Sequence, residues 1–266
     1  GTETAYTFDN FGRYENITVD NGAGLTYNYS NGKLSQIQRK ADGTTTLAYS
    51  FVYDEFGNTE EIKVGNKLLA SYDYIEPNGL LLSQSYGNQD SVSFTYDNLG
   101  RAKTTTYSSG RVLSYIYTGD GQLYSVHDSA TGYTYIYTYD SLGRLIASRV
   151  EDANSETLMR TKLWYNASNQ ITKQTWTVGD TTYQETYAYN TGDATLSSYQ
   201  NALGQTVSLG YDFLRRLSTV TAGNIYTQTY TYRDIDESKT TTQVSGLAYS
   251  GFTGAPSYGY TYDILG

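Results

Sequence analysis

The sequence has no cysteine and only one histidine, His127, among 266 residues. Without cysteine there is no disulfide framework, no thiol nucleophile and no thiolate ligand. A single histidine removes the usual ligand or base from most metal sites and most general-base arrangements. No apolar run approaches the roughly 20 residues that a bilayer-spanning helix needs. We therefore expect no cofactor, no resident metal and no membrane insertion.

Basic residues are also scarce, with 18 Lys and Arg against 27 Asp and Glu, and the formal net charge is −9. Affinity for nucleic acids and for anionic membranes comes from clustered basic side chains. The composition thus excludes a nucleic acid as the main partner.

Tyrosine is abundant, with 31 Tyr beside 26 Gly and only two Pro. One short pattern recurs as YTFDNFGRYENITV, FVYDEFGNTEEIKV, FTYDNLGRAKTTTY, YTYDSLGRLIASRV and LGYDFLRRLSTVTA. When the chain is aligned on the second aromatic of each copy, twelve anchors follow one another, mostly 21 to 24 residues apart. The anchors are Phe8, Tyr29, Tyr53, Tyr74, Tyr96, Tyr117, Tyr139, Tyr165, Tyr189, Tyr211, Tyr232 and Tyr262. Such a period is typical of a repeat architecture, and we expect one array over residues 1–266, cut from a longer protein.

Each repeat is predicted to be a β-hairpin. Ten of the twelve anchors have an aromatic residue two positions earlier, and residues i and i+2 share one face of a strand. In the turn that starts at Asp140, the Asp caps its own backbone and Gly143 supplies the left-handed conformation of a three-residue loop. This turn sets Tyr139 opposite Leu145. The expected turn residues of this kind are Asp9, Gly12, Asp54, Gly57, Asp97, Gly100, Asp140 and Gly143.

Other repeats reach the same pairing through different turns: Asn31–Gly32, residues 119–121, and a loop with Asn169 in the place of glycine. These turns set Tyr29 opposite Leu34, Tyr117 opposite Leu123, and Tyr165 opposite Ile171. Beyond the turns, the apolar residues change face relative to the aromatics unless a bulge intervenes. We therefore expect bulges, or two partly covered faces, around Ile17, Val19, Ile62 and Val64.

Twelve hairpins give roughly 24 strands, and open twisted sheets rarely exceed about 10 strands without curling. The predicted fold class is all-β, a long curled or spiral antiparallel sheet of tandem hairpins. Asp-containing and Gly-rich turns alternate with a double period of about 43 residues. A four-stranded blade of that length leaves a six-bladed β-propeller as the alternative.

The motifs YTYDSLGRL, FTYDNLGRA, YTFDNFGRY and FVYDEFGNT resemble the YD repeat of the Rhs family, which includes the shells of insecticidal toxin complexes and the barrel of teneurins. This resemblance covers most of the chain and implies a spiralled sheet in a hollow shell, secreted or on the bacterial surface. In bacterial relatives of the polymorphic-toxin kind, the shell encloses a C-terminal toxin. The implied partners are the rest of the chain: further repeats, a core domain and a possible toxin cargo. The sequence has no aspartate-proline cleavage motif and no toxin region, so neither activity carries over.

Candidate catalytic and metal-binding residues have structural interpretations. His127, Asp128 and Ser129 contain the residue types of a triad, but side chains alternate along a strand and do not converge. The turn aspartates lack the second carboxylate of a calcium site, and Arg13, Arg101 and Arg144 are expected to pair with them. We also expect no cation at the densest acidic cluster, Asp234, Asp236 and Glu237.

The tyrosine stripe has two interpretations. One is a ladder of rings that stack from hairpin to hairpin with their hydroxyls in water. The other is a sugar-binding platform, although the aromatic repeats of bacterial cell-wall and glucan-binding proteins are richer in Trp than this chain, which has only Trp164 and Trp176. The sequence favours a non-enzymatic structural module of the shell. A carbohydrate-binding or adhesive module of a bacterial surface protein, with glycans as partners, is the alternative.

Overall fold

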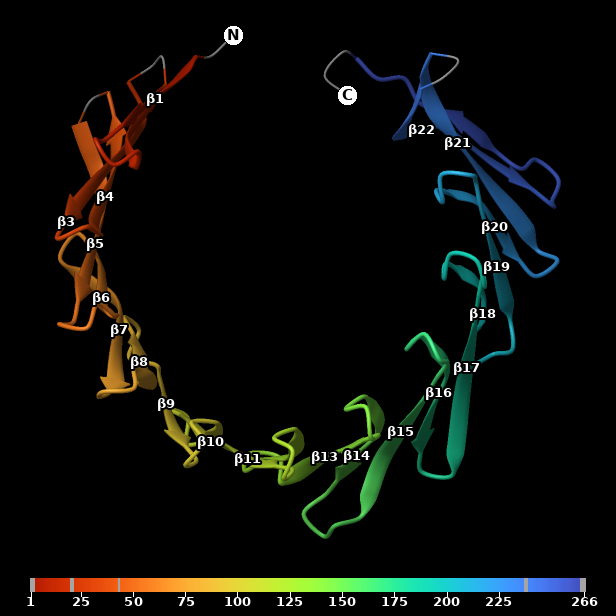
Figure 1. The fold of residues 1–266 in the computed structure, drawn as a ribbon, viewed down its shortest axis with the longest axis horizontal. Helices are drawn as coiled ribbons and strands as arrows, with labels where there is room; N and C mark the ends of the chain where they lie inside the picture. The colour runs from red at the N-terminus through yellow and green to blue at the C-terminus, as the bar shows by residue number, and fades with distance from the viewer. Residues whose placement is uncertain (1–2, 20–21, 43, 237–238, 264–266) are drawn as a thin grey trace. The chain divides into compact units, whose positions relative to one another are not determined.

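A computed structural model describes residues 3–19, 22–42, 44–236 and 239–263 of the chain. In these residues the chain forms 23 β-strands and no helix (Figure 1). The strands are β1 (Thr4–Phe8), β2 (Tyr14–Val19), β3 (Gly24–Ser30), β4 (Lys33–Ala41), β5 (Thr44–Tyr53), β6 (Thr59–Val64), β7 (Lys67–Ile75), β8 (Leu80–Tyr86), β9 (Ser91–Tyr96), β10 (Ala102–Tyr107), β11 (Val112–Tyr117), β12 (Leu123–Asp128), β13 (Tyr133–Tyr139), β14 (Leu145–Glu151), β15 (Thr157–Tyr165), β16 (Ile171–Val178), β17 (Thr181–Tyr189), β18 (Leu196–Gln200), β19 (Thr206–Tyr211), β20 (Leu217–Ala222), β21 (Tyr226–Asp236), β22 (Lys239–Ser250) and β23 (Ser257–Gly259). The all-β class is as predicted.

The chain divides into two compact units, residues 1–134 and residues 135–266. In the first unit, each strand from β1 to β11 pairs antiparallel with the strand that follows it in the sequence. In the second unit, each strand from β14 to β22 does the same. A propeller would interrupt this pairing after every fourth strand, so the propeller alternative is wrong for these strands. Tandem hairpins that form a curved antiparallel sheet are confirmed within each unit (Figure 1).

The hairpin pairings follow the turn chemistry. Tyr29 lies opposite Leu34, Tyr117 opposite Leu123, and Tyr165 opposite Ile171, as predicted. The amide of Asp140 donates to the carbonyl of Arg144 at 2.9 Å, and the amide of Gly143 donates to the carbonyl of Asp140 at 3.0 Å. The φ angle is +81° at Gly143, +62° at Asn169 and +63° at Arg215, so both non-glycine residues adopt the left-handed conformation.

A β-bulge follows the turn in most hairpins and explains the change of apolar face in the sequence. In the hairpin of β5 and β6, Tyr53 pairs with Thr59, but the residue before it, Val52, pairs with Glu61. The extra residue returns Ile62 to a position opposite Phe51. In the hairpin of β1 and β2 the register shifts in the same way between Thr7 and Phe8. The expected bulges are confirmed, and they keep the apolar side chains on the face of the aromatics.

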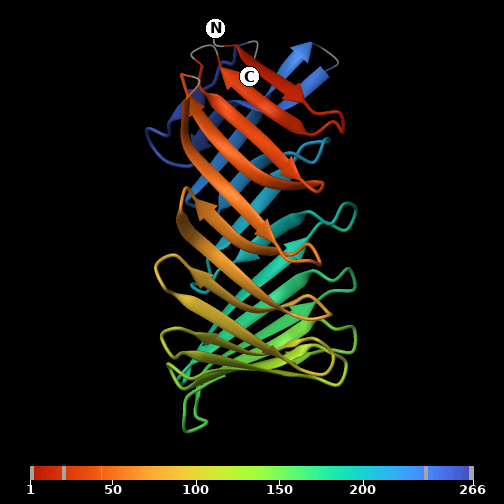
Figure 2. The ribbon, with the colours of Figure 1, turned by 90° about the vertical axis from the view of Figure 1, so that its left-hand side faces the viewer.

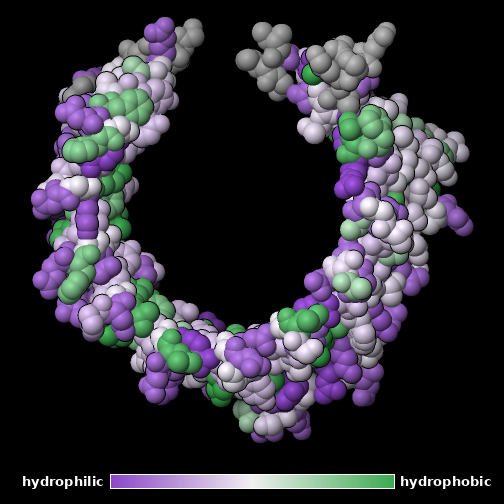
Figure 3. Space-filling model, viewed as in Figure 1, coloured by the Kyte–Doolittle hydropathy of each residue, from purple (hydrophilic) through white to green (hydrophobic). Residues whose placement is uncertain are grey.

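Each unit is a single sheet without a second layer. In the described residues, strands contact only their neighbours in the sequence, and the hairpin turns of the first unit lie along two opposite edges of its sheet (Figure 2). Only two apolar side chains, Ala70 and Ile136, are buried there. Apolar and polar side chains alternate over the visible surface (Figure 3). Stability in such a strip depends on contacts between successive strands.

Candidate functional site: the contacts between successive hairpins

The hydroxyls of the anchor tyrosines join each hairpin to the hairpin before it. The Tyr117 hydroxyl donates to the backbone carbonyl of Ala102 at 2.9 Å, and Ala102 is the residue paired with the preceding anchor, Tyr96. Tyr96 in turn donates to the carbonyl of Leu81, which pairs with Tyr74. Ten anchors donate in this way over 2.7 to 3.0 Å: Tyr29, Tyr53, Tyr74, Tyr96, Tyr117, Tyr165, Tyr189, Tyr211, Tyr232 and Tyr262.

The turn aspartates bind the arginine that follows the turn. In the turn that starts at Asp140, Oδ1 accepts from the amides of Leu142 and Arg144, and Oδ2 accepts from Arg144 Nε at 2.7 Å. Hydrogen bonds from the Arg144 side chain and amide hold the pKa of Asp140 below its usual range. The same ion pair joins Asp9 to Arg13, Asp97 to Arg101, and Asp212 to Arg216. The pairing of Arg13, Arg101 and Arg144 with their turn aspartates is confirmed.

Each of these arginines also covers the anchor ring of the next hairpin. The guanidinium carbon of Arg101 lies 4.4 Å from the centre of the Tyr117 ring. The corresponding distances are 3.9 Å for Arg13 over Tyr29, 4.7 Å for Arg144 over Tyr165 and 4.1 Å for Arg216 over Tyr232. A guanidinium over a tyrosine face is an attractive cation–π contact.

We call this arrangement a staple: a turn Asp, the Arg after the turn, and the next anchor Tyr, whose hydroxyl bonds the residue that follows the Arg. The four staples are Asp9–Arg13–Tyr29, Asp97–Arg101–Tyr117, Asp140–Arg144–Tyr165 and Asp212–Arg216–Tyr232. Each staple connects two successive hairpins through an ion pair, a ring contact and a hydrogen bond to backbone.

The expected ladder of stacked rings with hydroxyls in water is wrong. Tyr139 aside, Phe8 is the only anchor in the described residues with another aromatic ring in contact, at 4.9 Å from the Tyr14 ring. Successive anchors are two strands apart, about 9.6 Å, which exceeds the 4.5 to 7 Å of ring contacts. At the four staples an arginine lies over the ring, and the hydroxyl reaches a backbone carbonyl on the neighbouring strand.

The anchor rings are neither deeply buried nor open. All anchors except Phe8 are half-buried, and Phe8 is 53% exposed.

The sequence missed Arg216, because Arg215 stands before it in the place of the usual glycine. It also missed the hydroxyl bonds, which depend on distances between hairpins rather than within them.

The residues with triad side chains do not form a catalytic group. Asp128 is 2% exposed, and its carboxylate accepts from Arg111 Nε at 3.0 Å and Nη2 at 2.8 Å. His127 Nδ1 lies 3.1 Å from Thr134 Oγ1, and both His127 and Ser129 are exposed. Sequence reasoning missed the pair of Arg111 and Asp128, which joins residues 17 positions apart.

No candidate metal centre is found in the described part of the chain, where no three His, Asp or Glu side chains lie close enough to share an ion. The turn aspartates direct their oxygens to backbone amides and to the side chain after the turn, which is Asn58 at Asp54 and arginine at the four staples. Of the acidic cluster, Asp234 pairs with Thr240 across β21 and β22, and Glu237 lies outside the described residues. The described residues also contain no helix that is long and apolar enough to cross a membrane.

Comparison with known proteins confirms the resemblance to YD-repeat shells for the first part of the chain. Residues 1–114 match the family described as Teneurin YD-shell. No curated protein matches the chain.

Among solved structures, TcdB2-TccC3-TEV aligns with 96% of this chain at 14% identity and a TM-score of 0.49. The Photorhabdus luminescens Tc holotoxin pore aligns with 97% at 15% identity and a TM-score of 0.48. The chain spans 15% of the length of each of these chains.

Proposed function

We propose that this chain is a non-enzymatic structural module, a segment of the repeat wall of a secreted or surface-attached YD-repeat protein. The observation that carries the proposal is the repeated link between hairpins. The side chains with the most regular spacing in the sequence are used to hold one hairpin to the next. The twelve anchors and the turn residues from Asp9 to Gly143 are, in this proposal, structural positions.

The contacts of the anchors also argue against a sugar platform. Pyranose binding needs an open aromatic face and a free hydroxyl at its edge. At the four staples a guanidinium covers one face of the ring, and the hydroxyl donates to a backbone carbonyl. We therefore assign the anchors to wall building and not to glycan recognition.

The proposal extends to the whole protein through the family resemblance. The wall would enclose another part of the same polypeptide, a toxin in bacterial relatives, and the partners of these repeats would be further repeats and a core domain. An enclosed segment should resist protease while the wall is folded and become cleavable when the wall unfolds. Limited proteolysis of the full natural protein across a denaturant series measures this, and cleavage of the segment at the same rate in both states would reject the enclosing role.

The test of the wall against the lectin alternative compares two measurements on this chain. A glycan array should show no saturable binding, and Tyr165→Ala should lower the melting temperature, because it removes the ring under Arg144 and the bond to Leu145. Tyr86→Ala is the control, since Tyr86 is 44% exposed. Saturable sugar binding that Tyr165→Ala abolishes at an unchanged melting temperature would reject the structural role.

A further inference from the structure

One turn aspartate lacks the arginine that its counterparts bind. Asn58 stands where Arg13, Arg101, Arg144 and Arg216 stand in the other copies of the turn. Its amide Nδ2 donates to Asp54 Oδ2 at 2.8 Å, and its backbone amide donates to Oδ1 at 2.7 Å. The turn is therefore capped as in the other copies, but the short Asn side chain carries no charge over the next anchor ring, Tyr74.

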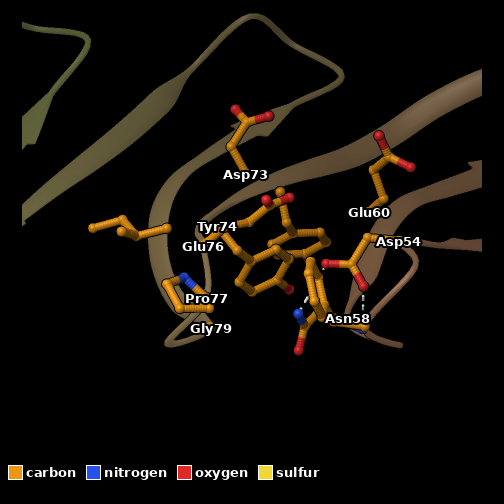
Figure 4. Close-up of a pocket in the computed structure, with 11 residues that line it drawn as sticks. Asp54, Asn58, Glu60, Asp73, Tyr74, Glu76, Pro77 and Gly79 are labelled. Atoms are coloured by element: carbon orange, nitrogen blue, oxygen red, sulfur yellow. Dashed lines mark hydrogen bonds between the residues drawn. The ribbon is translucent and has the colours of Figure 1, made fainter.

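A hollow of about 200 Å³ adjoins Asp54, Asn58 and Tyr74, between the turn of β5 and β6 and the turn of β7 and β8. Asp54 and Asn58 lie on one side of Tyr74, and Glu76, Pro77 and Gly79 lie toward the other (Figure 4). Its aromatic lining consists of Phe56, Tyr72 and Tyr74. The hydroxyl of Tyr74 still donates to the carbonyl of Thr59 at 2.9 Å. The ring is thus held in the position that it has in a staple.

The surroundings of the hollow are negative. Asp54, Glu60, Asp73 and Glu76 line it, and no Lys or Arg does. The Asp73 carboxylate accepts a hydrogen bond from Ser83, whereas the side chains of Glu60 and Glu76 make no hydrogen bond or ion pair within the described residues. Burial, then the neighbouring Tyr72 and the Asp54 charge, raise the pKa of Tyr74. Lys33, which follows the turn of the preceding hairpin, lies over the Tyr53 ring at 5.0 Å instead.

We infer that this hollow binds the guanidinium group of an arginine side chain from a polypeptide segment outside the sheet, which completes the staple in trans. Four copies of the site in the same chain already hold a guanidinium between a turn aspartate and a tyrosine ring. A planar guanidinium satisfies a carboxylate and stacks on an aromatic face at once, which an ammonium does less well. The volume is below the 300 Å³ or more of typical small-molecule pockets and suits one side-chain head group.

A second hairpin without arginine shows why the missing residue alone does not make a site. Gln170 occupies the arginine position there, but the turn residue is Asn166, whose Nδ2 donates to Gln170 Oε1 at 3.0 Å. No carboxylate faces the next anchor, Tyr189, from this turn. The charge of Asp54 therefore separates a guanidinium site from a neutral turn.

The test titrates the chain with N-acetyl-L-arginine N-methylamide and follows the tyrosine resonances by NMR. Saturable shifts at Tyr74 are expected, with weaker binding of the lysine analogue and none of the neutral citrulline analogue. Asn58→Arg supplies the guanidinium in cis, so it should fold and should weaken binding of the probe by about tenfold or more. The matched control Gln170→Arg should leave the binding unchanged.

Glu76→Gln gives an independent readout, because Glu76 is exposed and makes no bond that folding needs. It should weaken binding about two- to threefold even if Asn58→Arg failed to fold. Equal binding of the arginine, lysine and citrulline probes would overturn the inference. So would an absence of saturable shifts at Tyr74, or unchanged binding in both variants. These outcomes leave the wall-building role untouched, because the four filled staples do not depend on the hollow.

Discussion

Tyr96→Phe isolates the contribution of one anchor hydroxyl to the stability of the sheet. The Tyr96 hydroxyl donates to the carbonyl of Leu81 at 2.7 Å, and no cation covers its ring within the described residues. The substitution keeps the ring and removes only the donor. A net intramolecular hydrogen bond contributes about 0.5 to 1.5 kcal/mol, so we expect a loss of about 1 kcal/mol in the free energy of unfolding.

The assay is urea denaturation of the chain, combined with native-state hydrogen exchange of the amides in β8, β9 and β10. Exchange is needed because repeat arrays do not always unfold in one cooperative step. Tyr86→Phe is the control: Tyr86 ends β8, is 44% exposed, and should change stability by less than about 0.5 kcal/mol. Equal effects of the two substitutions, or no loss of exchange protection around Leu81, would refute the reasoning that the hydroxyl links the hairpins.

Gly143→Val should lower the free energy of unfolding by more than about 1 kcal/mol, because a β-branched residue is strained at the φ of +81°. Arg215→Val should lower it less, because Arg215 already carries a Cβ at the same position of its turn. Equal losses in chemical denaturation would contradict this. Arg101→Met should lower stability by about 0.5 to 1 kcal/mol, since it removes the half-exposed ion pair with Asp97 and the cation over the Tyr117 ring. Lys103→Met is the control, because Lys103 makes neither contact. A double-mutant cycle of Arg101 and Asp97 measures the coupling energy of the pair. Burial raises the pKa of several tyrosines, and that of Tyr187 to about 12, so stability should depend on pH in the alkaline range. As the pH rises, the unfolded chain releases its tyrosine hydroxyl protons before the folded chain does. The stability measured in thermal melts should therefore hold up to about pH 10 and fall toward pH 12. A stability that does not change over this range would contradict the burial of these tyrosines.

The sequence predicted what depends on contacts within one hairpin. The left-handed position of Asn169 and the pairing of Tyr29 with Leu34 follow from turn chemistry, which acts over about five residues. The bulges were predicted as well, because the apolar residues after the turn change face by one position in the sequence.

What joins one hairpin to the next was not predicted. The acceptor of the Tyr117 hydroxyl, the carbonyl of Ala102, lies on the adjacent strand of the preceding hairpin, and nothing in the local pattern names a backbone atom as its partner. Successive anchor rings lie two strands apart, which is too far for them to stack, so the ladder expected from the stripe is absent, and arginine covers the ring at the four staples. A signal for the staple was present: an arginine follows the turn in several copies, and Asn58 breaks that pattern.

The measurement that tests the central claim most directly is an electron cryo-microscopy map of the full natural protein that contains these repeats. The wall-building account predicts strands that pair in unbroken chain order through residues 3–134 and 135–263, with the anchor hydroxyls on backbone carbonyls and another part of the polypeptide on one side of the sheet. Repeats that stand free of the remaining chain, with anchor rings turned to solvent or covered by a glycan, would contradict it.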